Sequence, residues 1–200
     1  RKELGGMLYY GIPNYRLPKE RLAEDIQNIL ATGVETKMNT CIGDGDGEIS
    51  FKMLKENYDA VYISIGAHTD KKLGIPGEDA KGVISAIQML RDIGDGNPPD
   101  FTGKNVIVVG GGNVAMDATR SAIRLGAKNV SVMYRRRKAD MTALMDEIEA
   151  AIAEGAEILE LHAPQAIETN KKGHVTAMVA DPKIIGLITC LLYTSDAADE

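Results

Sequence analysis

The strongest constraint on the fold lies in the middle of the chain, where a β-branched run leads directly into a glycine turn. The run Val106-Ile107-Val108-Val109 is typical of a parallel strand that is buried on both faces. It leads into Gly110-Gly111-Gly112-Asn113-Val114-Ala115, which fits the pattern G-x-G-x-x-G/A with alanine in the last place. A helix is expected from Gly112 to Leu125. This strand–turn–helix context predicts a Rossmann unit.

The glycine pattern has a chemical reason. Gly110 permits a tight turn, Gly112 lets the backbone approach a pyrophosphate, and Ala115 allows the helix to pack closely on the strand. Free N–H groups at the start of the helix bind phosphates. The partial positive charge at this end of the helix adds to the attraction. We therefore assign Gly110 to Ala115 to cofactor binding. The alternative is a glycine-rich turn that binds nothing, which the flanking strand and helix disfavour.

The end of the next expected strand, Val130 to Tyr134, indicates which dinucleotide binds. An NAD site usually has a carboxylate there for the ribose hydroxyls. Here the run Arg135 to Lys138 is entirely basic, and no acid follows until Asp140. Guanidinium groups suit a 2′-phosphate, although a solvated basic loop is the alternative. We predict NADPH, with Arg135 and Arg136 as the first choices for the phosphate contacts.

Short apolar runs alternate with helical ones along the chain, which predicts an α/β fold with a largely parallel sheet. The glycines and prolines of residues 96–103 indicate a linker there. Further helices are expected over Lys19–Ala31, Val83–Asp92 and Ala143–Glu154, and Ser50 could cap a short helix that ends at Asn57. Further strands are expected over Val34–Met38, Ala60–Ile65, Ile158–Leu161, Ala166–Thr169 and His174–Ala180.

Four stretches together resemble a known family: Gly5 to Lys19 (GGMLYYGIPNYRLPK), Tyr58 to Ala67 (YDAVYISIGA), Leu73 to Glu78 (LGIPGE) and Gly103 to Arg137. They are similar to the small-subunit family of NADPH-dependent glutamate synthase and its related flavoprotein oxidoreductases. The resemblance covers about Leu4 to Gly186. It implies an FAD domain interrupted by an inserted NADPH domain.

The resemblance assigns residues 1–95 to a partial FAD-binding domain, 96–103 to the linker and 104–186 to a partial NADPH-binding domain. Both are expected to be incomplete three-layer Rossmann-like domains. The expected flavin contacts are Gly5 and Gly6 at the pyrophosphate, Gly11 and Arg16 in a loop near the flavin, and Ile65, Gly66 and Ala67 over the cofactor. Each has an alternative: the glycines could serve only to permit positive φ, and Arg16 could pair with a surface carboxylate.

Two residues depart from the family pattern. Ile65 stands where the family often has threonine, and Met145 stands where relatives often carry proline. The first departure weakens the expected flavin contact. The second touches only a helix start.

The activity that the resemblance implies is hydride transfer between NADPH and FAD. Electrons would then pass to an iron–sulfur partner or a larger subunit. The cofactors carry such chemistry, so no catalytic acid or base is assigned. We expect [4Fe-4S] clusters only in a part of the protein upstream of residue 1, and we expect the fragment to be inactive alone. The alternative is a dinucleotide-binding module, sensing or structural, without turnover.

Composition excludes several other classes. The net charge of -6 gives no basic field for nucleic acid, and no apolar run reaches the roughly 20 residues of a membrane helix. No metal site is predicted, and two cysteines in 200 residues suit a reducing compartment, so we expect a cytoplasmic protein. Residues 187–200 are interpreted as a non-native tail, because Cys190 to Glu200 resemble a translated sequencing adapter.

Overall fold

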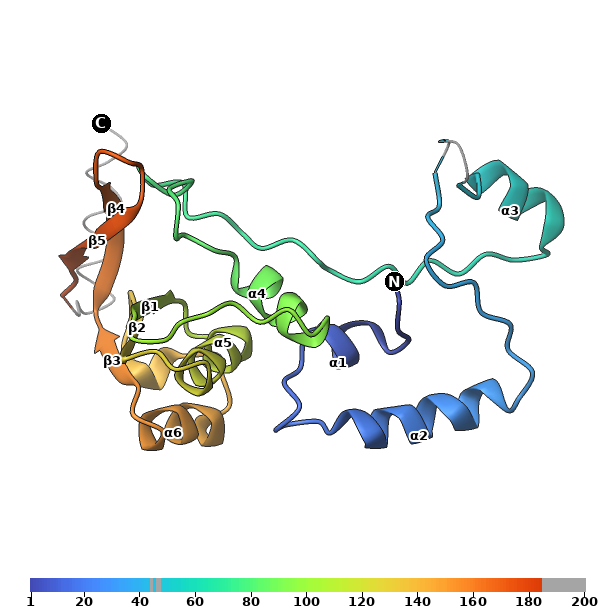
Figure 1. The fold of residues 1–200 in the computed structure, drawn as a ribbon, viewed down its shortest axis with the longest axis horizontal. Helices are drawn as coiled ribbons and strands as arrows, with labels where there is room; N and C mark the ends of the chain where they lie inside the picture. Colours follow the sequence, from blue (N-terminus) through green and yellow to red (C-terminus); the bar gives the residue numbers. More distant parts are fainter. Residues whose placement is uncertain (44, 46–47, 185–200) are drawn as a thin grey trace, which may run out of the picture. The chain divides into compact units, whose positions relative to one another are not determined.

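The chain forms two compact units in the computed structural model, which describes residues 1–43, 45 and 48–184 (Figure 1). The first unit comprises Arg1–Asp70 and Ile87–Pro99. The second comprises Lys71–Ala86 and the described residues from Asp100 onward. The predicted non-native tail, 187–200, and the last two residues of the predicted NADPH domain, 185 and 186, lie outside the described residues.

A three-stranded parallel sheet forms the centre of the second unit, with its strands in the order β1-β2-β3. Helix α5 connects β1 to β2, and the short 3-10 helix η1 and then α6 connect β2 to β3 (Figure 1). The elements are β1 (Asn105–Val109), α5 (Asn113–Arg124), β2 (Asn129–Tyr134), η1 (Lys138–Asp140), α6 (Met145–Ala153) and β3 (Glu157–Glu160). The predicted α/β class with a parallel sheet is confirmed. All of these elements except η1, which was not predicted, begin and end within two residues of the expected positions.

Both α5 and α6 cover the same face of this sheet. Val108, Val132 and Ile158 are in register across the three strands and pack against one cluster of buried side chains. The helices supply Met116 and Ile148, which are fully buried there. Small residues separate the large ones, so α5 can approach the strands closely. The glycine turn therefore lies between a strand of the sheet and a helix packed on it.

A β-hairpin follows the sheet and binds a segment from earlier in the chain. It consists of β4 (His162–Thr169) and β5 (Val175–Pro182), which pair antiparallel. The backbone N–H of Ile167 donates to the carbonyl of Pro76 at 2.8 Å. An added Cβ on Gly77 would clash with that same stretch of β4, so only glycine permits this approach. By its contacts, residues 71–86 group with the second unit. The predicted domain division at residues 96–103 stays a prediction.

The first unit contains four helices and, among its described residues, no paired strand segment longer than a single bridge. The side chain of Ser50 accepts a hydrogen bond from Met53 N at 3.1 Å, which is the cap that the sequence predicts. Gly94 lies so close to α1 that an added Cβ would be 3.0 Å from the Cα of Tyr10. The helices are α1 (Gly6–Tyr10), α2 (Lys19–Leu30), α3 (Phe51–Asn57) and α4 (Ala86–Gly94).

Two predicted strands are wrong. Neither Val34–Met38 nor Ala60–Ile65 is paired in the structure. The second segment is apolar, yet it is exposed along its whole length, and the side chain of Tyr62 is 91% exposed. A strand needs a hydrogen-bonded neighbour, and the described residues supply none to either segment. An apolar run alone therefore did not suffice to form a strand.

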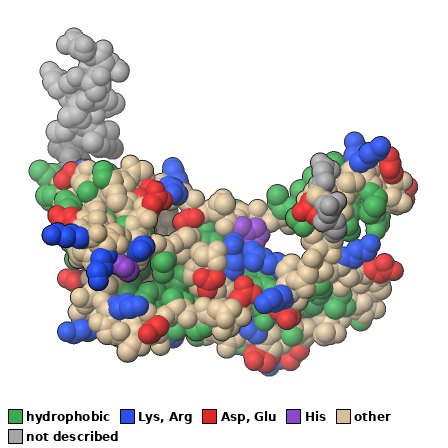
Figure 2. All heavy atoms as spheres, turned by 45° about the horizontal axis from the view of Figure 1, so that its top comes forward, with side chains coloured by type: hydrophobic (Ala, Val, Ile, Leu, Met, Phe, Trp, Pro, Cys, Tyr) green, Lys and Arg blue, Asp and Glu red, His purple; other side chains and the backbone are tan. Residues whose placement is uncertain are grey.

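The surface has no dominant sign of charge on the face that Figure 2 shows, where acidic and basic side chains are interspersed. In the part of the chain that the structure describes, no helix combines the length and apolar character required to cross a membrane.

Candidate functional site

The turn between β1 and α5 leaves the start of the helix accessible. Gly110 has φ +139, which favours glycine, and its N–H donates to the carbonyl of Met133 at 3.1 Å. Gly112 is the N-cap of α5 and provides no side chain to bind the first N–H groups. An added Cβ on Gly112 would meet only Thr142 Oγ1, at 3.6 Å. This open side beside uncapped N–H groups fits a pyrophosphate.

The middle glycine, Gly111, has a different role, which sequence reasoning did not identify. An added Cβ there would lie 2.7 Å from Cε2 of Tyr134 and 3.0 Å from Cγ of Met141. The carbonyl of Gly111 also accepts a hydrogen bond from Ala143 N at 3.0 Å. Gly111 is therefore small so that the segment after β2 can pack on the turn. The spacing of the motif gives no signal for this contact.

Asn113 also joins the glycine turn to the segment that follows β2. Its Oδ1 accepts a hydrogen bond from Leu144 N at 3.0 Å, which joins the start of α5 to the residue before α6. The assignment of Asn113 to cofactor binding stays a prediction. The side-chain Oδ1 of Asn113 already has the backbone N–H of Leu144 as its partner. Met145 is the first residue of α6, so the position where relatives often carry proline is a helix start, as expected.

The three arginines of the basic loop, residues 135–138, have different partners. Arg137 forms a two-point ion pair with Asp140, with Nε–Oδ2 and Nη2–Oδ1 distances of 3.0 Å each. The hydrogen bond from Arg137 lowers the pKa of the Asp140 carboxyl. Arg136 lies with its guanidinium carbon 5.6 Å from the ring centroid of Tyr134, and Arg135 has no ion pair with any described residue. Both are exposed at the end of β2. The loop thus leaves Arg135 and Arg136 available to a ligand.

The loop itself is anchored by further hydrogen bonds. Tyr134 Oη donates to the carbonyl of Asp140 at 3.0 Å, and Lys138 N donates to Glu160 Oε2 at 2.8 Å. Beyond the loop, Arg120 on α5 pairs with Glu147 and Glu154 on α6. The glycine turn, the basic loop and the two helices therefore form one connected framework.

The predicted flavin residues of the N-terminal segment surround α1. Gly5 has φ +106 and Gly6 has φ +52, so both adopt conformations that favour glycine. An added Cβ on Gly5 would be 3.0 Å from Leu22 Cδ2, whereas Gly6 has open space at that position. Gly11 has φ -107, so its small size is required by contact with Met7 and not by positive φ. Arg16 lies in the turn that follows, where its N–H donates to the carbonyl of Pro13 at 3.0 Å.

The second group of predicted flavin residues has different local surroundings from the first. Ile65, Gly66 and Ala67 lie in an exposed segment without a paired strand. The atoms nearest to Gly66 belong to His68, whereas those around Gly5 belong to α1 and α2. The structure thus shows the predicted glycine turn at the start of α5, while the assignment of the two groups to a flavin stays a prediction.

Comparison with known proteins identifies the family to which the chain belongs. A family model described as pyridine nucleotide-disulphide oxidoreductase matches residues 4–193. The chain belongs to this family. It is 43% identical over 176 residues to the NADP(+)-dependent formate dehydrogenase subunit beta of Moorella thermoacetica, a match that covers 87% of the chain and 24% of the relative.

Two further relatives confirm the predicted resemblance to the glutamate synthase small subunit. A putative glutamate synthase [NADPH] small chain of Cereibacter sphaeroides is 37% identical, over 80% of the chain and 40% of the relative. The glutamate synthase [NADPH] small chain of Escherichia coli is 34% identical, over 88% of the chain and 39% of the relative. The chain thus spans less than half the length of each of these three relatives.

Membership of the pyridine nucleotide-disulphide oxidoreductase family implies binding of FAD and a pyridine nucleotide. The turn from Gly110 to Ala115 fits the pyrophosphate of a dinucleotide, because Gly112 is open and α5 is uncapped.

Proposed function

We propose that the chain is the dinucleotide-handling part of a flavoprotein oxidoreductase that takes hydride from NADPH. The observation that carries this proposal is the open side of Gly112 at the uncapped start of α5. Residues Gly110 to Ala115 would hold the pyrophosphate by backbone N–H groups and the positive end of the helix. When bound, FAD would accept the hydride from nicotinamide C4 at its N5 atom.

The preference for NADPH is supported by the charges after β2. The first carboxylate after the strand, Asp140, is already paired with Arg137 and is therefore a poor acceptor for ribose hydroxyls. Arg135 and Arg136 remain available for charge-assisted hydrogen bonds to a 2′-phosphate. Three relatives whose names include NADP(+) or NADPH agree with this assignment.

The flavin side of the proposal concerns the first unit. We assign FAD binding to residues 1–95, with Gly5 and Gly6 at the pyrophosphate, Gly11 and Arg16 in the flavin loop, and Ile65 to Ala67 over the cofactor. Residues 104–186 would bind NADPH, with 96–103 as the linker. The chain's own residues would bind and orient the cofactors, and none is assigned to proton transfer.

We further propose that electrons pass to an iron–sulfur partner or a larger subunit, because several relatives are named as subunits of larger enzymes. A cytoplasmic location is proposed from the scarcity of cysteine.

A second candidate function is a dinucleotide-binding module without flavin or turnover. The exposed position of Ile65 to Ala67, in a segment without a paired strand, favours it. The two candidates are separated by purifying the protein as its gene encodes it and adding NADPH without oxygen. Bound flavin that NADPH bleaches supports the oxidoreductase. A colourless protein that still binds NADPH supports the second candidate and contradicts the first.

A further inference from the structure

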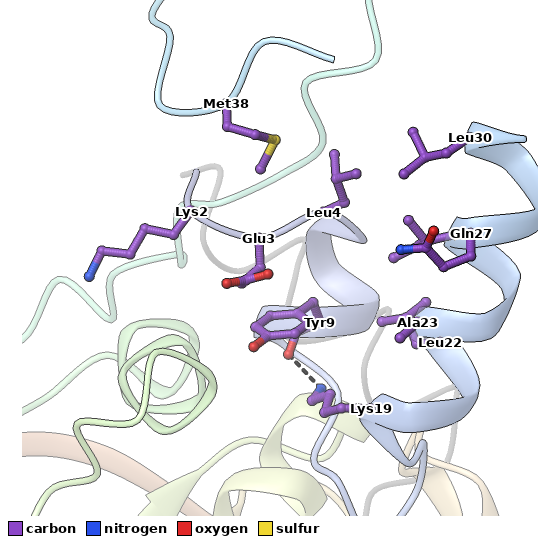
Figure 3. A pocket seen from close by; sticks show the side chains of 11 residues that line it. Lys2, Glu3, Leu4, Tyr9, Lys19, Leu22, Ala23, Gln27, Leu30 and Met38 are labelled. Carbon is purple, nitrogen blue, oxygen red and sulfur yellow. Dashed lines mark hydrogen bonds between the residues drawn. The ribbon is translucent and has the colours of Figure 1, made fainter. Parts of the chain in front are cut away.

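The side chain of Lys19, the first residue of α2, folds back onto the end of α1. Its Nζ donates to the carbonyl oxygens of Leu8 at 3.1 Å, Tyr9 at 2.5 Å and Ile12 at 2.8 Å. The bond to Tyr9 is drawn in Figure 3, at the base of a cavity of about 230 Å³ lined by α1 and α2. An ammonium has three donors, and here each has a carbonyl partner.

These carbonyls lie at and just beyond the end of a helix, where the last carbonyl groups lack partners within the helix. A cation is stabilised at such a position because the helix dipole is negative there. Lys19 also lies over the ring of Tyr9, with Nζ 5.2 Å from the centroid. The Lys19 ammonium is partly buried, and this burial lowers its pKa because the charged form is partly withdrawn from water.

Lys19 also closes the loop that separates the two helices. Its backbone N–H donates to Asn14 Oδ1 at 2.9 Å, so the loop is attached to the residue through both main chain and side chain. At the other end of the loop, Gly11 N and Ile12 N both donate to the carbonyl of Met7, at 2.8 and 3.0 Å. The loop from Gly11 to Pro18 contains no helix or strand. Its shape is set by these attachments together with the bonds inside it from Arg16 N and Leu17 N to the carbonyl of Pro13.

We propose that Lys19 is the positioning residue of the flavin loop and fixes Gly11 to Pro18 without itself touching the cofactor. This inference rests on the proposed function, which places Gly11 and Arg16 beside FAD. Removal of the ammonium would leave three carbonyls without their shared donor. The loop would then sample other conformations. FAD binding would be weaker, because ordering the loop again costs conformational entropy.

The test compares Lys19→Met, Lys19→Arg and the control Lys52→Met in the protein as its gene encodes it. Lys52 is a suitable control because its side chain is 83% exposed and lies 3.8 Å from its ion-pair partner, Glu56. The dissociation constants for FAD, after removal and rebinding of the flavin, and for NADPH are measured for each variant. NADPH binding reports on folding independently of the flavin loop.

We expect Lys19→Met to weaken FAD binding by about tenfold, while NADPH affinity changes less than about twofold. Lys19→Arg should restore part of the loss, and Lys52→Met should match the wild type. FAD binding by Lys19→Met equal to wild type overturns this inference alone. Equal losses of FAD and NADPH affinity would indicate a general folding role and also overturn it. A wild-type protein that takes up no FAD overturns the proposed function and this inference together.

Discussion

The ring of Tyr134 occupies the space that a side chain on Gly111 would need, since a Cβ there would lie 2.7 Å from Cε2 of the ring. This contact attaches the basic loop to the glycine turn. The turn therefore has two kinds of glycine. Gly111 is needed for packing between protein segments, whereas Gly112 faces open space where a cofactor would bind.

The two glycines should respond differently to the same substitution. Gly111→Ala should lower the free energy of unfolding by about 1–3 kcal/mol, because the aromatic ring cannot yield without displacing the loop. Gly112→Ala should cost less than about 1 kcal/mol, since its backbone conformation suits alanine. It should nevertheless weaken NADPH binding by at least about tenfold, because the methyl group blocks the pyrophosphate. Urea unfolding and NADPH titration measure both effects. Equal loss of stability in the two variants would contradict this division.

The arginines after β2 should separate NADPH from NADH. Changing Arg135 and Arg136 together to alanine should weaken NADPH by about 10- to 100-fold, because charge-assisted hydrogen bonds to the 2′-phosphate are lost. NADH, which lacks that phosphate, should bind nearly as before. Arg137→Ala is the matched control, since Arg137 is paired with Asp140. Isothermal titration with both dinucleotides gives the result. Equal losses for NADPH and NADH would refute the 2′-phosphate assignment.

The ion pairs between α5 and α6 should make the stability of the folded chain depend on pH in the acidic range. Burial acts to raise the pKa of Glu154, but hydrogen bonds from Arg124 and Arg120 outweigh it, and the net pKa lies below 4.5. A carboxylate with a depressed folded pKa contributes its full stability above the unfolded pKa. That contribution is lost as pH falls through the folded pKa. We therefore expect the melting temperature to fall as the pH drops below about 4.5, the ordinary value for glutamate.

The variant Arg120→Met tests the same network. Arg120 has a side chain that is only 13% exposed, so its loss should cost about 2 kcal/mol at neutral pH. The acid dependence should also become shallower, because part of the pKa shift of Glu154 disappears. Arg21→Met serves as control, since that side chain is 74% exposed. An unchanged pH profile of the melting temperature in Arg120→Met would count against the network.

The start of α6 should accept proline. Met145 is its first residue and is 49% exposed, and Leu144 before it has φ -60 and ψ 137, a conformation that precedes proline readily. Met145→Pro should leave stability unchanged or raise it by about 0.4–1 kcal/mol. Ala150→Pro, inside the same helix, should cost about 3 kcal/mol or more. Thermal unfolding of both variants decides the point, and a loss at Met145→Pro would show that the helix begins elsewhere.

The sequence predicted the dinucleotide unit well because its signals are local. The β-branched run before Gly110 and the glycine pattern lie next to each other in the chain, and β1 and α5 formed where they were expected. The contact of Gly111 with Tyr134 joins residues 23 positions apart, so no spacing rule indicates it.

The wrong strand predictions also have a physical reason. The segment Ala60–Ile65 has strand composition, but a strand forms only beside a partner, and sequence composition does not report whether a partner is present. For the flavin site, Gly5 and Gly66 were predicted to share one cofactor through the family resemblance, and that assignment stays a prediction.

The central claim is that NADPH bound at the glycine turn gives its hydride to a flavin in the same protein. The most direct measurement is the rate of flavin reduction, followed without oxygen by rapid mixing, with NADPH and with NADPH deuterated at C4. We predict rapid bleaching of bound flavin that slows with the deuterated cofactor, because the C4–H bond breaks in that step. Bound flavin that stays oxidised with saturating NADPH would contradict the account.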